Sequence, residues 1–409
     1  MTVNGIIAEY NPLHQGHIYQ MQDAAGHTGA DYTIVVMSGN FVQRGAPAIT
    51  DKFSRTQMAL NAGADLVLEL PLPYAVSSAE YFASGGVSLL NSLGVVTHLC
   101  FGSEAGATPA LQEIAEILVQ EPPSYSHALQ TALKNGQSFP AARTRALFSY
   151  APHLAQYSDL LDSPNNILAI EYLKSLYRTQ SSIQPYTTLR TGNGYNDDSL
   201  DEYSSALAIR KALLSGQSPE VLKQHIPACT TDILLRSDVA QALIGTNDFS
   251  SMLRYKLRLH ANEGYTDFLD VSEQLSERIL NHLDNFRDFD SFCQLLKTRE
   301  ITYTRITRCL LHILLDMPQS ILVPYEESGI PYARVLGFRR DAAPLLSAIK
   351  HNTNVPLITK LADAHKTLNP GAMVLLQEEI KRSSIYYDVL ASKTGSTTTN
   401  EYRTPLVII

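Results

Sequence analysis

Two histidines one helical turn apart are the first residues in this chain whose spacing suggests chemistry. They lie in His14-Gln15-Gly16-His17, directly after an apolar run at residues 3–8 that predicts a strand. A helix start offers unpaired backbone N–H groups and a partial positive charge, which suit a phosphate. Two imidazoles on one side of that helix could donate hydrogen bonds to phosphate oxygens as negative charge develops. Two surface histidines without a ligand are the alternative for these four residues alone.

A second predicted helix start has a similar character. Ser204 and Ser205 precede an apolar helical segment, and Arg210 follows one to two turns later. Hydroxyl and N–H groups there could bind an anion, and a guanidinium suits the outer phosphates of a nucleotide. A plain serine N-cap with a solvated arginine would give the same pattern.

The elements that must position these residues alternate in the first half of the chain. We expect helices between strands at residues 3–8, 32–37, 65–70, 97–101 and 183–190. Strands separated by helices form right-handed βαβ units and a parallel sheet. Beyond about Gly216 the pattern is mainly helical. We therefore predict an α/β fold with a nucleotide-binding domain over residues 1–215 and a mainly α-helical domain over residues 216–409.

Charge limits the kinds of partner. The 409 residues include 32 basic and 40 acidic side chains, and the net charge of −8 argues against a protein that coats nucleic acid uniformly. No lysine or arginine precedes Arg44. Any anion bound by the first 43 residues must therefore be held by backbone N–H groups, helix dipoles and histidines.

Residues 297–360 form a locally basic segment, with nine basic and five acidic side chains. Basic groups bind RNA phosphates, and an aromatic ring can stack on an unpaired base. Ordinary surface charge is the alternative. The residues that we predict to bind RNA are Lys297, Arg299, Tyr303, Arg305 and Arg308.

Other composition features point to a reduced cytoplasmic protein. No apolar run approaches the roughly 20 residues that span a membrane, and no leader peptide is visible. The four cysteines form no CxxC pair, so we expect neither a zinc site nor a disulfide framework. No pattern identifies a protein partner.

Longer motifs resemble the bacterial tRNA(Met) cytidine acetate ligases, a family of the HIGH-type nucleotidyltransferase superfamily. The most specific is the thirteen-residue run GIIAEYNPLHQGH at residues 5–17. The others, in order along the chain, are MSGNFVQRG at 37–45, DLVLELP at 65–71, FGSE at 101–104, PNNIL at 164–168 and YTR at 303–305.

The resemblance implies a Rossmann-like nucleotidyltransferase domain and a two-step reaction. ATP and acetate would give acetyl-adenylate and pyrophosphate, and the acetyl group would pass to N4 of the wobble cytidine of elongator tRNA(Met). It implies catalytic roles for His14 and His17, with Mg²⁺ accompanying ATP, although no carboxylate cluster marks its ligands. The implied ATP contacts are Ile7, Ala8, Glu9, Tyr10, Asn11, Pro12, Leu13, His14, Gln15, Gly16, His17, Ile18, Tyr19, Gln20, Gly102, Asn165, Asn166, Arg190, Ser205 and Arg210.

Two further cations and two other functions stay open. Lys52 and Arg55 could neutralise pyrophosphate or acetate, or lie on the solvated face of a helix. A cofactor-type adenylyltransferase is disfavoured by the long, partly basic helical half. A non-catalytic protein that binds ATP and RNA would keep the nucleotide site without consuming ATP.

Overall fold

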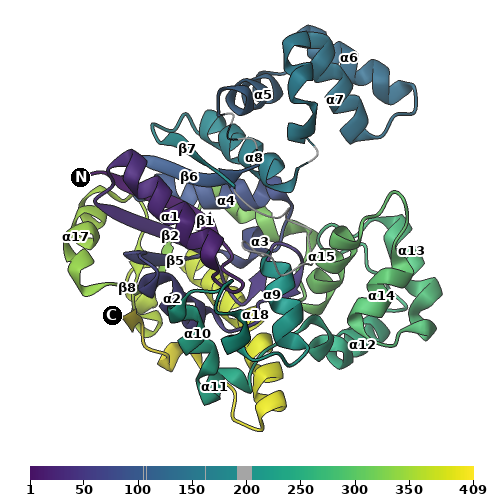
Figure 1. Ribbon diagram of the computed structural model, residues 1–409. Coiled ribbons are helices and arrows are strands. Elements are labelled where there is room, and N and C mark those ends of the chain that lie inside the picture. The colour runs from purple at the N-terminus through teal and green to yellow at the C-terminus, as the bar shows by residue number, and fades with distance from the viewer. Residues whose placement is uncertain (105, 107, 162, 191–204) are drawn as a thin grey trace.

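The computed structural model describes residues 1–104, 106, 108–161, 163–190 and 205–409. Within this part of the chain, eight strands form one mixed sheet in the order β10-β8-β5-β2-β1-β6-β7, with β9 paired to β8 (Figure 1). Their bounds are β1 Val3–Ala8, β2 Tyr32–Ser38, β5 Leu66–Leu70, β6 His98–Ser103, β7 Gln184–Leu189, β8 Ala333–Phe338, β9 Leu357–Ile358 and β10 Val407–Ile408.

The predicted parallel sheet is confirmed from β5 to β7, because all these neighbouring strands run in one direction. The edge differs, since β8 pairs with β5 in the antiparallel direction. An antiparallel neighbour needs no βαβ crossover, so a strand returning from the helical part can join there. Three strands beyond residue 216 thus belong to this sheet, and the proposed division of the chain at that point stays a prediction.

Helices cover both faces of the sheet, as the alternation of buried side chains requires. On β2, Ile34 and Val36 face a core that includes Val87 of α4 (Ala79–Ser92) and Ala169 of α8 (Pro164–Arg178). Val35, between them, packs with residues of the helices α1 (Gln15–Thr28) and α2 (Lys52–Asn61) on the opposite face.

Seven further helices extend from the sheet in two groups that Figure 1 shows apart from each other. One consists of α5 (Thr108–Gln120), α6 (Pro123–Lys134) and α7 (Phe139–Tyr150). The other holds α12 (Ser250–Leu259), α13 (Glu273–His282), α14 (Phe289–Leu296) and α15 (Tyr303–Leu314). The other helices are α3 (Leu72–Ala75), α9 (Ala206–Leu214), α10 (Ala228–Leu235), α11 (Ser237–Ala240), α16 (Val323–Ser328), α17 (Ala343–Asn352) and α18 (Pro370–Thr394).

A small hairpin joins the second helical group to the sheet. Its strands are β3 (Phe41–Val42) and β4 (Ala46–Pro47), and Thr307 Oγ1 of α15 donates to the carbonyl oxygen of Arg44 at the turn (2.6 Å). Gly45 has φ +76°, and a Cβ there would lie 2.3 Å from the backbone nitrogen of Arg308. Only glycine allows this close approach, so α15 is fixed against the turn.

No helix in the described part of the chain is long and apolar enough to cross a membrane.

Candidate active site

The two histidines of the first motif cap helix α1 and orient each other. The backbone N–H of Gly16 donates to Nδ1 of His14 (3.1 Å), and the backbone N–H of His14 donates to Nδ1 of His17 (3.2 Å). The two rings stack with centroids 3.7 Å apart. Because both Nδ1 atoms accept, each neutral ring carries its proton on Nε2 and can donate from there.

Burial keeps both imidazoles neutral. It is the largest cause that lowers the pKa of His14 to about 3, followed by the positive charges of Arg190 and Arg210. The pKa of His17 also lies well below its usual range, because of burial first and then His14 and Arg190. A bound phosphate would oppose these shifts, since an adjacent anion favours the imidazolium.

These histidines open onto a pocket at the carboxyl edge of the sheet. Its volume is about 1030 Å³, part of it open to solvent. The pocket lies beside β1, where strand order changes direction: β2 and β5 lie on one side, and β6 and β7 on the other. Open α/β sheets bind ligands at this kind of switch point. The predicted residues that line the pocket are Ile7, Ala8, Glu9, Tyr10, Asn11, His14, His17, Gln20, Gly102, Asn165, Arg190, Ser205 and Arg210.

Seven predicted residues do not line the pocket. They are Pro12, Leu13, Gln15, Gly16, Ile18, Tyr19 and Asn166. Leu13 belongs to the core between α1 and the sheet. Gly16 contributes its N–H to the cap of His14, so its role here is to orient the histidine. A helix or loop presents only some of its side chains to a ligand. A contiguous sequence motif does not show which of its residues these are.

The second helix start reaches the same pocket. Ser205 Oγ accepts the backbone N–H of Ala208 (3.2 Å) and caps α9, and Arg210 Nη1 donates to the carbonyl oxygen of Asn11 (2.7 Å). Arg210 thereby ties α9 to the loop after β1. Ser204 lies outside the described residues. The starts of α1 and α9, about 190 residues apart in sequence, thus contribute to one wall.

Gly102 and Arg190 are neighbours at the ends of β6 and β7. A Cβ at residue 102 would lie 3.2 Å from Cγ of Arg190, so a larger side chain would push against the arginine stem. The backbone N–H of Arg190 donates to the carbonyl oxygen of Ser103 (3.0 Å), which extends the strand pairing. Because residue 102 has no side chain, Arg190 can lie on the pocket wall without a steric clash.

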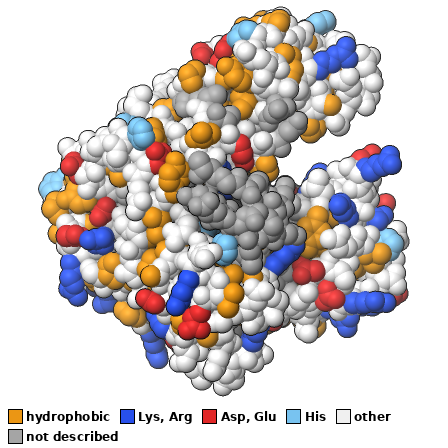
Figure 2. All heavy atoms as spheres, in the orientation of Figure 1, with side chains coloured by type: hydrophobic (Ala, Val, Ile, Leu, Met, Phe, Trp, Pro, Cys, Tyr) orange, Lys and Arg blue, Asp and Glu red, His pale blue; other side chains and the backbone are white. Residues whose placement is uncertain are grey.

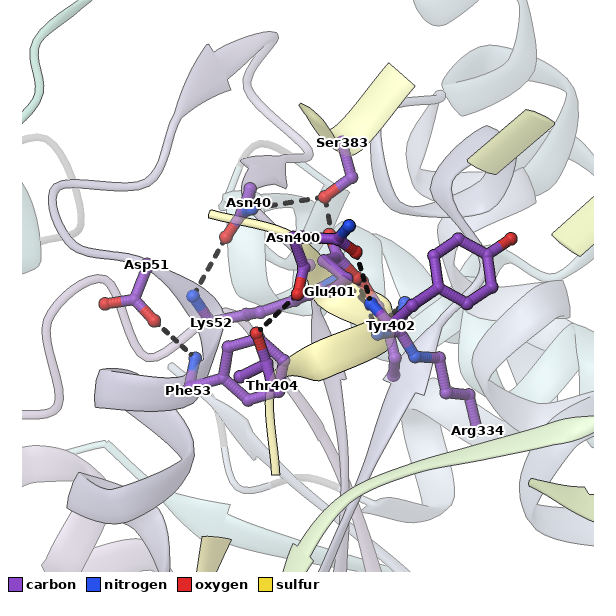
Figure 3. Close-up of polar contacts among 12 residues, drawn as sticks. Asn40, Asp51, Lys52, Phe53, Arg334, Ser383, Asn400, Glu401, Tyr402 and Thr404 are labelled. Carbon is purple, nitrogen blue, oxygen red and sulfur yellow. Dashed lines mark hydrogen bonds and ion pairs between the residues drawn. The ribbon is translucent and has the colours of Figure 1, made fainter. Parts of the chain in front are cut away.

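Lys52 does not reach the pocket, and it is not solvated either, so both expectations for it are wrong. Its Nζ lies 2.8 Å from Oε1 of Glu69. It also lies 2.8 Å from Oε2 of Glu401, which Figure 3 shows beside Lys52 and Arg334. Arg334 pairs with the same two carboxylates, at 2.8 Å and 2.6 Å. The two cations and two carboxylates of this cluster balance in charge. Such pairing offsets the free-energy cost of removing charged groups from water.

Arg55 is also fully buried and holds backbone instead of substrate. Its guanidinium donates to carbonyl oxygens of Glu9 (2.7 Å), Ser38 (3.0 Å), Gly39 and Thr50 (3.1 Å). Glu9 follows β1, Ser38 and Gly39 lie at the end of β2, and Thr50 lies just before α2. Arg55 therefore shapes the loop that carries Glu9, which lines the pocket.

The pocket also contains residues that we had not predicted as contacts. They are Gln43, Arg44, Phe82, Phe101, Leu168, Tyr172, Ala206 and Leu207. Most lie inside or beside motifs already recognised: the SGNFVQRG, FGSE and PNNIL runs and the second helix start. Phe82 lies on α4 in an ordinary apolar stretch, and no sequence signal marks it.

The residues predicted to bind RNA differ in accessibility. Lys297, Arg299 and Arg305 are exposed, and Arg308 is partly buried. Tyr303 is partly buried, and its hydroxyl donates to Oδ1 of Asp290 (3.1 Å). The exposed cations lie on or before α15, the helix that packs against the Arg44 turn at the pocket.

Within the described residues, no group of three or more His, Cys, Asp or Glu side chains could hold a metal ion.

Comparison with known proteins identifies the family. The model of the HIGH nucleotidyl transferases matches residues 1–402. The chain belongs to this family. It is also 42% identical over 392 residues to the tRNA(Met) cytidine acetate ligase of Acetivibrio thermocellus, covering 94% of each chain. The ligase of the same name from Thermoanaerobacter sp. strain X514 is 41% identical over 409 residues and 100% of each chain. The resemblance to these ligases is therefore confirmed.

Solved structures extend the match to the whole fold. The apo form I crystal structure of Thermotoga maritima TmcAL superimposes with a TM-score of 0.94, at 30% identity over 100% of both chains. The same protein bound with alpha-thio ATP gives a TM-score of 0.91 at 29% identity, again over 100% of both chains. The HIGH nucleotidyltransferase fold predicted from the motifs is therefore confirmed.

Proposed function

We propose that this chain is an ATP-dependent ligase that acetylates N4 of the wobble cytidine of elongator tRNA(Met). The observation that carries the proposal is the meeting of two helix starts, at His14 and Ser205, around one pocket in a chain of the ligase family. The positive end of a helix dipole lies at each start and favours an anion such as phosphate. Neutral histidines and two arginines add donors without a lysine.

In the first step an oxygen of acetate attacks the α-phosphorus of ATP, and the bond to pyrophosphate breaks. Negative charge builds on the phosphate oxygens in the transition state. His14 and His17 donate from Nε2 to these oxygens, and Arg210 and Arg190 neutralise the departing pyrophosphate. Because the rings are neutral in the free protein, their attraction for ground-state ATP is limited, which favours selective binding of the transition state.

In the second step N4 of the cytidine attacks the carbonyl carbon of acetyl-adenylate, AMP leaves, and the amine loses a proton. The tRNA approaches past Lys297, Arg299, Arg305 and Arg308, with its anticodon loop directed to the Arg44 turn. Figure 2 shows a hollow between the surfaces over α5–α7 and α13–α15, with Lys and Arg side chains on the α13–α15 side. Basic side chains beside a hollow can pair with the phosphates of an RNA that enters it.

Mg²⁺ is proposed to arrive with ATP. The described residues offer no metal cluster, and Glu9 is the single carboxylate among the described residues of the pocket wall. Mg²⁺ commonly keeps its waters and binds substrate phosphates with few protein ligands, so these residues fit an ion held mainly by the nucleotide. It would neutralise phosphate charge. The reaction is placed in the cytoplasm because its substrate is tRNA.

One incubation tests the proposal. The protein is mixed with labelled acetate, elongator tRNA(Met) and either ATP or no nucleotide, and the RNA is digested and examined for labelled N4-acetylcytidine. We expect product with ATP, and none when acetyl-CoA replaces ATP and acetate. A tRNA(Met) whose wobble cytidine is replaced by uridine is the matched control.

Two alternative results would reject the ligase. Pyrophosphate release with a nicotinamide or pantetheine phosphate, but not with acetate, would indicate a cofactor-type adenylyltransferase. Tight ATP and RNA binding without any turnover would indicate a non-catalytic binding protein.

A further inference from the structure

Glu104 connects the end of β6 to the first turn of α8 through three hydrogen bonds. Its Oε1 accepts from Nδ2 of Asn165 at 2.5 Å, and its Oε2 accepts from the backbone N–H of Asn166 at 3.1 Å. In return, the backbone N–H of Glu104 donates to Oδ1 of Asn166 at 3.0 Å. Asn166 thus uses its backbone N–H and its Oδ1 within the protein, and it is 1% exposed.

The same contacts leave Asn165 with one defined orientation. An ionised carboxylate can only accept hydrogen bonds, so only the NH₂ edge of the Asn165 amide can face Glu104. Its Oδ1 must then lie on the other edge of the group, and none of the described residues donates to that oxygen. Asn165 lines the pocket, so Oδ1 is the atom that it has left for a ligand.

The surroundings of Asn165 suit the nucleoside half of ATP. Asn165, Leu168 and Tyr172 line the pocket from one face of α8, and the rings of Tyr172 and Phe101 lie 5.6 Å apart. This wall offers apolar surface and the amide oxygen of Asn165, which suit a flat base and its sugar. The phosphates fit the other wall, with the two helix starts and Arg210.

We propose that Glu104 is a positioning residue that fixes the Asn165 amide, so that Oδ1 accepts a hydrogen bond from the nucleoside half of ATP. The donor is the 6-amino group of adenine or a ribose hydroxyl. The inference rests on the proposed role of this pocket in binding ATP. Glu104 touches no substrate, and it acts by excluding the flipped amide, which would present NH₂ to the same donor.

The test is a double-mutant cycle on ATP affinity, measured by calorimetry without acetate or tRNA. Glu104→Gln keeps the size of the side chain but no longer selects one orientation of the amide. We expect it to raise the Kd for ATP roughly three- to tenfold, as for one lost oriented hydrogen bond. In an Asn165→Ala background, the same substitution should have no further effect on this Kd.

Two nucleotide analogues identify the donor. If the amino group is the donor, the unsubstituted protein binds inosine triphosphate more weakly than ATP. Glu104→Gln should then reduce the ratio of these two Kd values. If a ribose hydroxyl is the partner, the narrowing appears with 2′-deoxy- or 3′-deoxy-ATP instead. The control is Glu113→Gln on α5, which loses an exposed contact to His153 and should leave ATP affinity unchanged.

Several results would overturn the inference. They are an unchanged Kd in Glu104→Gln, effects of the two substitutions that simply add, or no change in discrimination for any analogue. Melting temperatures are recorded for each variant, and Glu104→Ala, which also removes the carboxylate, replaces Glu104→Gln if the latter does not fold. ATP affinity needs no acetyl transfer, so normal ATP binding with no N4-acetylcytidine rejects the ligase and leaves this result intact.

Discussion

The backbone N–H of His14 donates to Nδ1 of His17, and the two rings stack 3.7 Å apart. The motif thus holds both imidazoles in one orientation before any ligand binds. Tyr10 adds to this support, because its ring packs edge-on against His17 with centroids 4.8 Å apart. Such preorganisation is what electrostatic catalysis requires, since the donors need not be reordered as charge develops.

His17→Ala should therefore slow chemistry more than it weakens binding. We expect the rate of acetyl-adenylate formation, measured as pyrophosphate release, to fall by about 10²-fold or more. The Kd for ATP should rise less than about tenfold. His27→Ala on the exposed side of the same helix is the control. Equal losses in rate and affinity would refute the transition-state role.

The depressed pKa of His14 predicts a pH-dependent stability. Between pH 6.5 and about 3 the unfolded chain binds a proton at His14 that the folded chain excludes, so the free energy of unfolding falls as pH falls. The slope contributed by this group approaches about 1.4 kcal/mol per pH unit.

The matched variant for this effect is His14→Asn. Asparagine can still accept the N–H at the helix start but does not titrate. Urea unfolding of the ATP-free protein at pH 7 and pH 5 should show a shallower decline for the variant. Identical declines would mean that residue 14 is not the titrating group.

Glu401→Gln should destabilise the fold through the buried charge cluster. Of the two carboxylates that pair with both Lys52 and Arg334, it leaves only Glu69. We expect the free energy of unfolding to fall by about 3–5 kcal/mol in chemical denaturation. Glu378→Gln, which weakens an exposed pair with Lys381 and a partly buried pair with Arg382 on α18, should cost less than about 1 kcal/mol, because Arg382 keeps its bonds to the carbonyl oxygens of Leu315 and Asp316. Similar losses in both variants would contradict a special role for the cluster.

Arg305→Ala should weaken tRNA binding and spare the first step. Filter binding at several salt concentrations should show a lower affinity and a salt slope reduced by about one, while acetyl-adenylate forms at the normal rate. Lys366→Ala, which removes an exposed lysine outside the predicted set, is the control. Slower acetyl-adenylate formation without tRNA would instead move Arg305 to the ATP site.

Tyr303→Phe, on the same helix, separates the role of the hydroxyl from the role of the aromatic ring. The hydroxyl that donates to Asp290 disappears, but the ring remains. We expect a lower melting temperature with unchanged tRNA affinity, because the partly buried ring packs against the core. A loss of affinity at full stability would show that the hydroxyl contacts RNA.

The sequence by itself determined the local elements and the family. An apolar run and a helical pattern place β1 and α4 at their observed bounds, because both signals depend on neighbours within a few residues. The strands at residues 65–70 and 183–190 were predicted to within a residue at each end. The thirteen-residue motif carried the family, since a contiguous run of that length is far more specific than two spaced histidines.

Only the tertiary structure decided which of the recognised residues meet. Arg210 reaches Asn11, Glu104 holds Asn165, and Lys52 is buried against Glu401, across 199, 61 and 349 residues of chain. Such partners are set by how the strands order in the sheet and how helices pack on it, and neither is encoded in local periodicity. A lysine on an amphipathic helix therefore looks solvated in the sequence until a carboxylate from the chain's last residues covers it.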